Sequence, residues 1–164
     1  MTQPPNTGSL VYQVHFELTR ARRVVAGRLG ILRFAPGWYF YTGSARRGAA
    51  GRIRRHFLRR KKRHWHIDHL LSGPAFGIAF VLILPSGFAG GECGLHKRTF
   101  ERLAATMPAP GFGATDCREG CGSHLARLSR PVLPADLMAT LEVPVSAKPL
   151  IVDSPKDLAQ SVFL

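Results

Sequence analysis

The amino-acid sequence predicts a single domain of the α+β class. Segments with the patterning of β-strands precede, separate and follow two segments with the 3.6-residue periodicity of amphipathic helices. The length of 164 residues allows one domain with a buried core but not two of ordinary size. The hydrophobic fraction of 45% is that of a globular protein, which excludes a disordered basic tail.

Strands are expected where apolar residues alternate or run together: residues 9–18, 24–34 as a hairpin turning near 28–30, 38–42, 78–84, and 123–128 as an edge strand. Helices are expected where apolar residues recur every three or four positions: residues 48–62, 65–71 and 92–107. Residues 111–122 form a glycine-rich loop. Residues 1–8 are expected to be a flexible lead-in, 9–130 the domain, and 131–164 a proline-containing tail or loosely packed extension.

Basic residues are concentrated in one part of the chain. The formal net charge is +13, and no acidic residue lies between Glu17 and Asp68. A dense charge of one sign destabilises a compact fold unless a polyanion binds it. DNA is therefore the expected partner, with RNA as an alternative. A well-solvated basic face is the other explanation of the charge.

Membrane insertion and secretion are not expected. Residues 1–8 are polar and lack the apolar core of a signal peptide. The longest apolar stretch, residues 76–85, is about half of what spans a bilayer. Three cysteines without a secretory signal indicate a reduced, cytoplasmic protein. The sequence leaves the oligomeric state open.

An aromatic strand followed by a basic helix provides the main candidate site. Tyr39 and Tyr41 share one face of the expected strand, and Arg52 and His56 share one face of the expected helix. A tight turn at Gly43 would bring the two elements together. Phenol, guanidinium and imidazole groups would then converge on a site suited to a phosphodiester. Alternatively, the tyrosines pack in the core with their hydroxyls at its rim.

Backbone contacts to nucleic acid are expected from the turn and from the basic residues around it. The candidates are Gly43, Ser44, Arg46, Arg47, Arg55, Arg59, Lys61 and Lys62.

A metal ligand is expected among the few acidic residues. Glu92 opens the second helix after two glycines, and Asp68 lies in the short run W-H-I-D-H. Mg²⁺ binds through one or two carboxylates together with water and phosphate oxygens, so these two residues are the best candidates. The alternative for Glu92 is a favourable interaction with the helix dipole.

Cysteine and histidine residues define a second candidate site. Cys117, Cys121 and His124 follow one another closely, with Cys93 upstream, and His66 and Asp68 belong to the same set of potential ligands. These residues could bind Zn²⁺, but the spacing matches no familiar zinc finger. Buried thiols and hydrogen-bonding histidines are the favoured interpretation.

These motifs, in this order, resemble a branch of the GIY-YIG nuclease superfamily whose members are found fused to DNA-repair glycosylases. The shared patterns are Y-x-Y-x-G-S-A at 39–45, R-x-x-R-H at 52–56, K-K-x-x-W-H-I-D at 61–68, E-C at 92–93, G-F-G-x-x-D-C at 111–117 and S-H-L at 123–125. The resemblance covers residues 8–128.

The resemblance implies a small three-stranded antiparallel sheet flanked by helices, with extra strands or a hairpin and a C-terminal extension. It also implies cleavage of phosphodiester bonds with one divalent ion, Mg²⁺ or Mn²⁺, bound by Glu92. Arg52 corresponds to the phosphate-binding arginine, Tyr41 belongs to the second half of the name motif, and His56 occupies a polar position of the active site.

The chain departs from the superfamily pattern in its first strand, where the motif tyrosine falls at Leu10. Tyr12 lies two residues further along and faces the same side. The task of activating water therefore falls to Tyr12, Tyr39 or His56, or the catalytic base is absent.

Three functions follow from these observations. The leading one is a metal-dependent DNA endonuclease with a role in DNA repair or processing. The second is a binding module that has kept the fold and lost the chemistry. The third is an interaction domain stabilised by zinc.

Overall fold

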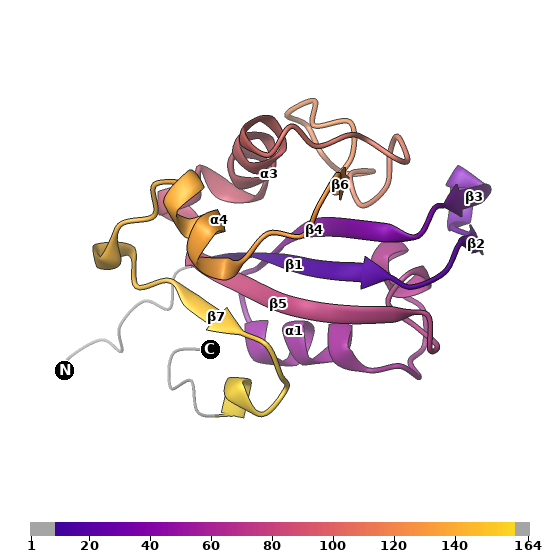
Figure 1. The fold of residues 1–164 in the computed structure, drawn as a ribbon, viewed down its shortest axis with the longest axis horizontal. Coiled ribbons are helices and arrows are strands. Elements are labelled where there is room, and N and C mark those ends of the chain that lie inside the picture. The colour runs from indigo at the N-terminus through magenta and orange to yellow at the C-terminus, as the bar shows by residue number, and fades with distance from the viewer. Residues whose placement is uncertain (1–8, 160–164) are drawn as a thin grey trace.

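A five-stranded antiparallel sheet forms the centre of the molecule (Figure 1). The computed structural model describes residues 9–159, and within them the strand order is β6–β4–β1–β5–β7. The strands are β1 (Leu10–Leu18), β4 (Gly37–Ala45), β5 (Phe76–Pro85), β6 (Leu125–Leu128) and β7 (Leu150–Val152). The α+β class is confirmed. The resemblance implied a three-stranded sheet, whereas this sheet has five strands, because β6 pairs with β4 and β7 with β5 at its two edges. The expected lead-in of residues 1–8 lies outside the described residues.

A separate hairpin projects from one end of the sheet (Figure 1). Its strands β2 (Arg22–Val25) and β3 (Ile31–Phe34) pair antiparallel and are joined by a 3₁₀ turn at Gly27–Leu29. The expected hairpin and its turn are confirmed.

Within residues 37–147, four α-helices and two 3₁₀ helices lie around the sheet. They are α1 (Ala49–Phe57), η2 (His66–His69), α2 (Ser86–Ala89), α3 (Gly91–Arg102), α4 (Pro134–Thr140) and η3 (Val145–Ala147).

Two helices are shorter than their periodicity predicts. The expected helix 48–62 ends at Phe57, because Leu58 adopts an extended conformation and Lys61 Nζ donates to the carbonyls of Arg55 and His56. Those carbonyls belong to the last turn of the helix, where the Arg55 carbonyl also accepts from the Leu58 amide. The expected helix 92–107 ends at Arg102, just before Ala104 takes a positive φ of 48°.

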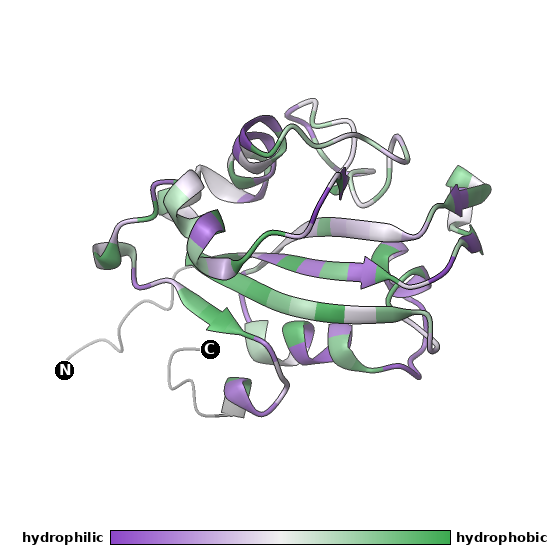
Figure 2. Cartoon of the chain, in the orientation of Figure 1, coloured by the Kyte–Doolittle hydropathy of each residue, from purple (hydrophilic) through white to green (hydrophobic). Residues whose placement is uncertain are grey.

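Helices cover both faces of the sheet, and β1 alternates between them. Tyr12, Val14 and Phe16 face one apolar cluster, which includes Ile53 of α1. Val11, on the opposite face, packs in a cluster that includes Leu95 of α3. Because both faces are covered, β5 is apolar along most of its length, as Figure 2 shows and as its sequence predicts.

The described part of the C-terminal extension, residues 131–159, packs into the folded core rather than lying loosely against it. Leu137 and Leu141 of α4 are buried in the same cluster as Leu95, and β7 pairs with β5 through Val152 and its neighbours. Because β7 completes one edge of the sheet, the expected boundary at residue 130 does not separate a domain from a tail.

Gly43 is required for a different reason than the one the sequence indicated. It lies inside β4, directly opposite Tyr12, and the chain turns only afterwards, where Gly48 has a φ of 64°. A Cβ at position 43 would lie 2.6 Å from Tyr12 Cζ, well inside van der Waals contact. Gly43 therefore lets the Tyr12 ring lie across the strand, and the predicted tight Gly43–Ser44 turn is wrong.

None of the helices in residues 9–159 has the length and apolar character needed to cross a membrane.

Candidate functional site

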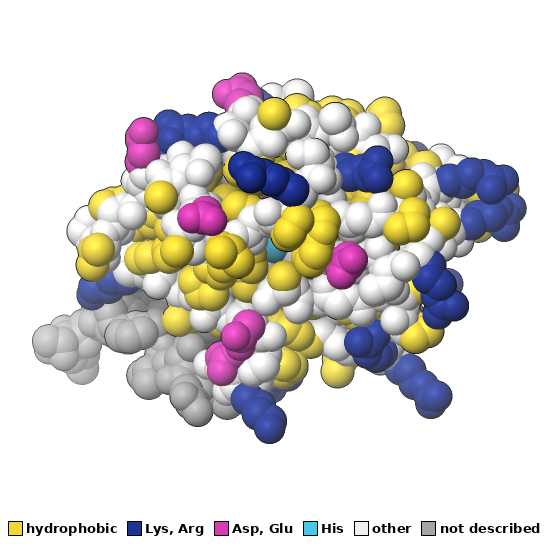
Figure 3. Space-filling view, in the orientation of Figure 1, with side chains coloured by type: hydrophobic (Ala, Val, Ile, Leu, Met, Phe, Trp, Pro, Cys, Tyr) yellow, Lys and Arg dark blue, Asp and Glu magenta, His cyan; other side chains and the backbone are white. Residues whose placement is uncertain are grey.

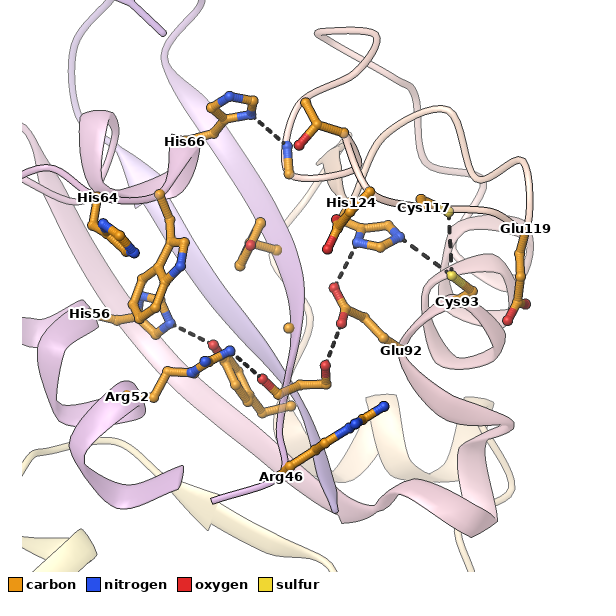
Figure 4. Close-up of a pocket in the computed structure, with 18 of the residues that line it drawn as sticks. Arg46, Arg52, His56, His64, His66, Glu92, Cys93, Cys117, Glu119 and His124 are labelled. Carbon is orange, nitrogen blue, oxygen red and sulfur yellow. Dashed lines mark hydrogen bonds and ion pairs between the residues drawn. The ribbon is translucent and has the colours of Figure 1, made fainter. Parts of the chain in front are cut away.

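A cleft of about 740 Å³ opens between α1 and the start of α3 (Figure 4). Most of the predicted site residues line it, although they come from distant parts of the chain. Those residues are Tyr12, Tyr41, Gly43, Ser44, Arg46, Arg52, His56, His66, Glu92, Cys117 and His124. Further lining comes from His64, Trp65, Cys93, Gly113, Thr115, Asp116, Arg118 and Glu119.

Arg52 is held in the cleft wall by two contacts. Its Nη1 donates to the carbonyl of Ser44 at 2.7 Å, and its guanidinium lies 4.8 Å from the centre of the Trp65 ring. The stacked ring fixes the guanidinium plane, and the single carbonyl leaves other N–H donors for a ligand. Such a preorganised fork suits the oxygens of a phosphodiester.

Tyr12 and His56 form a hydrogen-bonded pair beside Arg52. Tyr12 Oη lies 3.0 Å from His56 Nε2. Burial, reinforced by Lys61, lowers the pKa of His56 to about 3. Burial also raises the pKa of Tyr12 well above its usual value. The pair is therefore uncharged at neutral pH, with one hydrogen bond between the Tyr12 hydroxyl and the neutral imidazole.

The two tyrosines of the aromatic strand have different surroundings. Tyr41 lines the cleft, and burial raises its pKa. Tyr39 lies two residues before Tyr41 on the same face of β4. There it stacks on Phe16 and donates its hydroxyl to the carbonyl of Ala35 at 2.7 Å. Tyr39 is thus a core residue outside the cleft, and this position does not support its predicted catalytic role.

Glu92 lies on the opposite side of the cleft, in the first turn of α3. Its Oε2 accepts from Ser44 Oγ at 2.6 Å, and its Oε1 lies 2.7 Å from His124 Nδ1 (Figure 4). Burial alone would lower the pKa of His124, but the Glu92 carboxylate outweighs burial and raises it. Glu92 is thereby fixed in orientation while facing Arg52 across the cleft.

The three cysteines and His124 gather next to Glu92. Their four potential ligand atoms all lie within 4.8 Å of one another. Cys93 Sγ is 3.5 Å from Cys117 Sγ and 3.6 Å from His124 Nε2, and the cysteines are not paired in a disulfide. Burial would raise the pKa of Cys117, but the backbone amides of Cys121 and Glu119 lower it to about 6.

Asp68 supports the cleft from behind and does not line it. Its side chain is fully buried, and Oδ2 accepts from Arg55 at 2.9 Å and from the amides of His64 and Trp65. Burial would raise the pKa of Asp68, but these donors lower it. Asp68 thus fixes Trp65, the platform for Arg52, and its expected metal-binding role is not supported by this position.

The other predicted basic residues lie in two groups. Arg46 reaches the cleft, whereas Arg47, Arg59 and Lys62 are exposed outside it. Arg55 forms an ion pair with Asp68, and Lys61 donates to a carbonyl at the end of α1. His66, on the cleft wall, accepts from the amide of Gly113 at 3.0 Å and so links η2 to the glycine-rich loop.

A buried hydrogen-bond network that supports the site was not indicated by any pattern in the sequence. Gln13 Nε2 donates to Thr42 Oγ1 and Thr99 Oγ1, and Thr42 Oγ1 lies 3.0 Å from His96 Nδ1, all of them buried. The network joins β1, β4 and α3 and so sets the position of the helix that carries Glu92. Isolated polar residues within amphipathic segments do not reveal such long-range pairing.

A divalent ion in the cleft itself would need Glu92 as its main protein ligand, whereas the set of residues that could hold a metal is the adjacent cysteine–histidine cluster. A carboxylate has about four lone-pair positions, and Glu92 uses two of them for Ser44 and His124. Mg²⁺ needs few protein ligands, because water and substrate phosphate complete its shell. Glu92 is the residue that would bind the ion, and Asp116 and Glu119 also line the cleft.

The fold and the cleft define an α+β protein with a cationic, carboxylate-containing site next to a cysteine–histidine cluster. Residues 11–143 match the family described as "Domain of unknown function DUF123", and the chain belongs to this family. Neither the curated proteins nor the solved structures include a significant match.

Proposed function

We propose that the protein is a metal-dependent endonuclease that cleaves phosphodiester bonds in DNA, with a fold of the GIY-YIG nuclease type. The observation that carries this proposal is the cleft itself. Arg52 and the Tyr12–His56 pair on one side face Glu92 on the other. A cationic fork, a polar hydroxyl and a carboxylate are the groups that metal-assisted phosphodiester cleavage requires.

The order of the site residues along the fold supports the nuclease type. Tyr41 lies on a central strand, Arg52 on the helix that follows it, and Glu92 on a later helix. Leu10 takes the place of the first motif tyrosine, but the Tyr12 ring reaches the cleft from the same strand. This position of Tyr12 favours an enzyme over a pure binding module.

Each residue has a distinct task in this proposal. Arg52 binds the scissile phosphate and stabilises its developing charge. Tyr12, oriented by His56, accepts a hydrogen bond from the attacking water and positions it. Glu92 provides the protein ligand for the divalent ion. When bound, Mg²⁺ or Mn²⁺ acidifies water and neutralises charge on the phosphate and the leaving oxygen.

Basic residues beyond the cleft support a nucleic-acid substrate. A second hollow of about 570 Å³ follows the end of α1. Its cationic lining consists of Arg20, Arg22, Arg59, Arg60, Lys61 and Arg63. Figure 3 shows further Arg and Lys side chains at the hairpin end and around the edge of the molecule, and apolar atoms in the middle of this face. Phosphates on either side of the cleaved bond would bind such a surface without sequence preference.

Wild-type protein is expected to nick supercoiled plasmid DNA when Mg²⁺ or Mn²⁺ is added and not in EDTA. Binding to the same DNA should persist in EDTA and weaken steeply with salt, because many Lys and Arg residues displace counterions. The measurement compares gel conversion to open circles with binding by fluorescence anisotropy. Intact, salt-sensitive binding without cleavage of plasmid, branched or abasic DNA would contradict the enzyme and favour the binding module.

A further inference from the structure

We propose that Cys93, Cys117, Cys121 and His124 bind a structural zinc ion, separate from the divalent ion of the cleft. The chain has three cysteines, and all of them belong to this cluster. The ligands would be the three sulfur atoms and His124 Nε2. A Cys₃His set that fills all four positions is typical of structural zinc and leaves no position for substrate.

The spacing of the ligand atoms suits a tetrahedral ion. With Zn–S bonds of about 2.3 Å and a Zn–N bond of about 2.0 Å, tetrahedral ligands lie roughly 3.5 to 3.8 Å apart. The Cys93–Cys117 separation of 3.5 Å and the Cys93–His124 separation of 3.6 Å are close to these values. The widest separation in the cluster is 4.8 Å or less, so small side-chain movements complete the site.

The surroundings of His124 provide an independent argument. Its Nδ1 faces the Glu92 carboxylate at 2.7 Å, which leaves Nε2 directed at the cysteines (Figure 4). Zinc-binding histidines almost always have their second ring nitrogen bonded to a carboxylate, carbonyl or water. Glu92 therefore orients His124 for the ion, and the ion in turn fixes the position of Glu92.

The glycine-rich loop shows what such an ion would stabilise. Residues 111–122 contain four glycines with positive φ, at 111, 113, 120 and 122. This loop has no strand or helix of its own and forms part of the cleft wall through residues 113 and 115–119. An ion bound to Cys117, Cys121 and Cys93 would join the loop to α3 and so hold that wall in place.

Elemental analysis of the full-length chain tests the proposal. Protein produced with zinc in the medium and purified without chelator is expected to contain about one equivalent of zinc. Exchange with Co²⁺ should give the intense visible absorption and thiolate charge-transfer bands of tetrahedral cobalt. Roughly a tenth of an equivalent or less, together with octahedral cobalt spectra, would overturn the proposal. So would an oxidised Cys93–Cys117 pair in freshly prepared protein.

Variants locate the ion without relying on activity. Cys117→Ser and His124→Ala are expected to lose the zinc and the tetrahedral cobalt spectrum, and to melt at a lower temperature. His64→Gln is the matched control, because His64 lines the same cleft outside the cluster and should retain the metal. Retention of stoichiometric zinc by Cys117→Ser would place the ion elsewhere. Because metal content is measured on inactive protein too, failure of the nuclease proposal leaves this test unaffected.

Discussion

Replacing Arg52 by alanine is expected to abolish DNA cleavage while most of the DNA affinity remains. The guanidinium is preorganised by Ser44 and Trp65, and losing one such donor at a developing charge lowers the rate by about 100-fold or more. Affinity should fall far less, because only one phosphate contact among many is lost. The slope of log affinity against log salt concentration should change by about one. Single-turnover cleavage and fluorescence anisotropy on the same DNA measure the two effects.

Arg54→Ala is the matched control for this prediction. Arg54 is exposed on the same helix and does not line the cleft, so its loss should reduce affinity slightly and leave the single-turnover rate near that of the wild type. Arg52→Lys should restore little activity, since an ammonium cannot reproduce the stacked, two-pronged contact. Equal losses of affinity and rate in Arg52→Ala would instead make Arg52 a binding residue.

Replacing Asp68 by alanine is expected to cause the largest loss of stability. The change leaves the Arg55 guanidinium and the amides of His64 and Trp65 without their acceptor. Removing a charged acceptor of this kind costs about 2 to 4 kcal/mol. For a chain of this length, the melting temperature should fall by roughly 5 to 15 °C. Calorimetry or circular dichroism measures the shift.

The pH dependence of this effect follows from the pKa of Asp68. Its carboxyl has a pKa below the ordinary value in the folded protein. Its stabilising contribution is therefore present above the unfolded-state pKa and is lost as the pH falls toward the folded-state pKa. The difference in melting temperature between the wild type and Asp68→Ala should therefore become smaller in acid. Glu101→Ala, an exposed acid on α3, is the control. A melting temperature for Asp68→Ala equal to that of this control would contradict the structural role.

Local patterns predicted much of the fold and the site. Alternation and apolar runs located the hairpin and the strands β1, β4 and β5, and helical spacing located α1 and α3. The Y-x-Y and R-x-x-R-H motifs pointed to Tyr41, Arg52 and His56, which the structure brings together around one cleft.

The remaining features depend on contacts that local patterns do not reveal. Tyr39 and Tyr41 are two residues apart and lie on the same face of β4, so the sequence does not distinguish them. Only the packed structure shows that Phe16 and Phe34 enclose Tyr39. The proline-containing segment after residue 130 looked peripheral, yet Val152 pairs with Val81 of β5. Likewise, the spacing of the cysteines gave a weak signal, because Cys93 joins the other two only through the position of α3.

The measurement that tests the central claim most directly is plasmid nicking by Glu92→Gln beside the wild type, with zinc content and DNA affinity determined on the same samples. The substitution keeps the size of the side chain and removes the charge that binds Mg²⁺ or Mn²⁺. We expect nicking to be lost while DNA affinity and zinc are retained, because the basic surface and the four zinc ligands are unchanged and the Gln amide oxygen can still accept a hydrogen bond from His124 Nδ1. Metal-dependent nicking at the wild-type rate by Glu92→Gln would contradict the assignment of this cleft as the catalytic site.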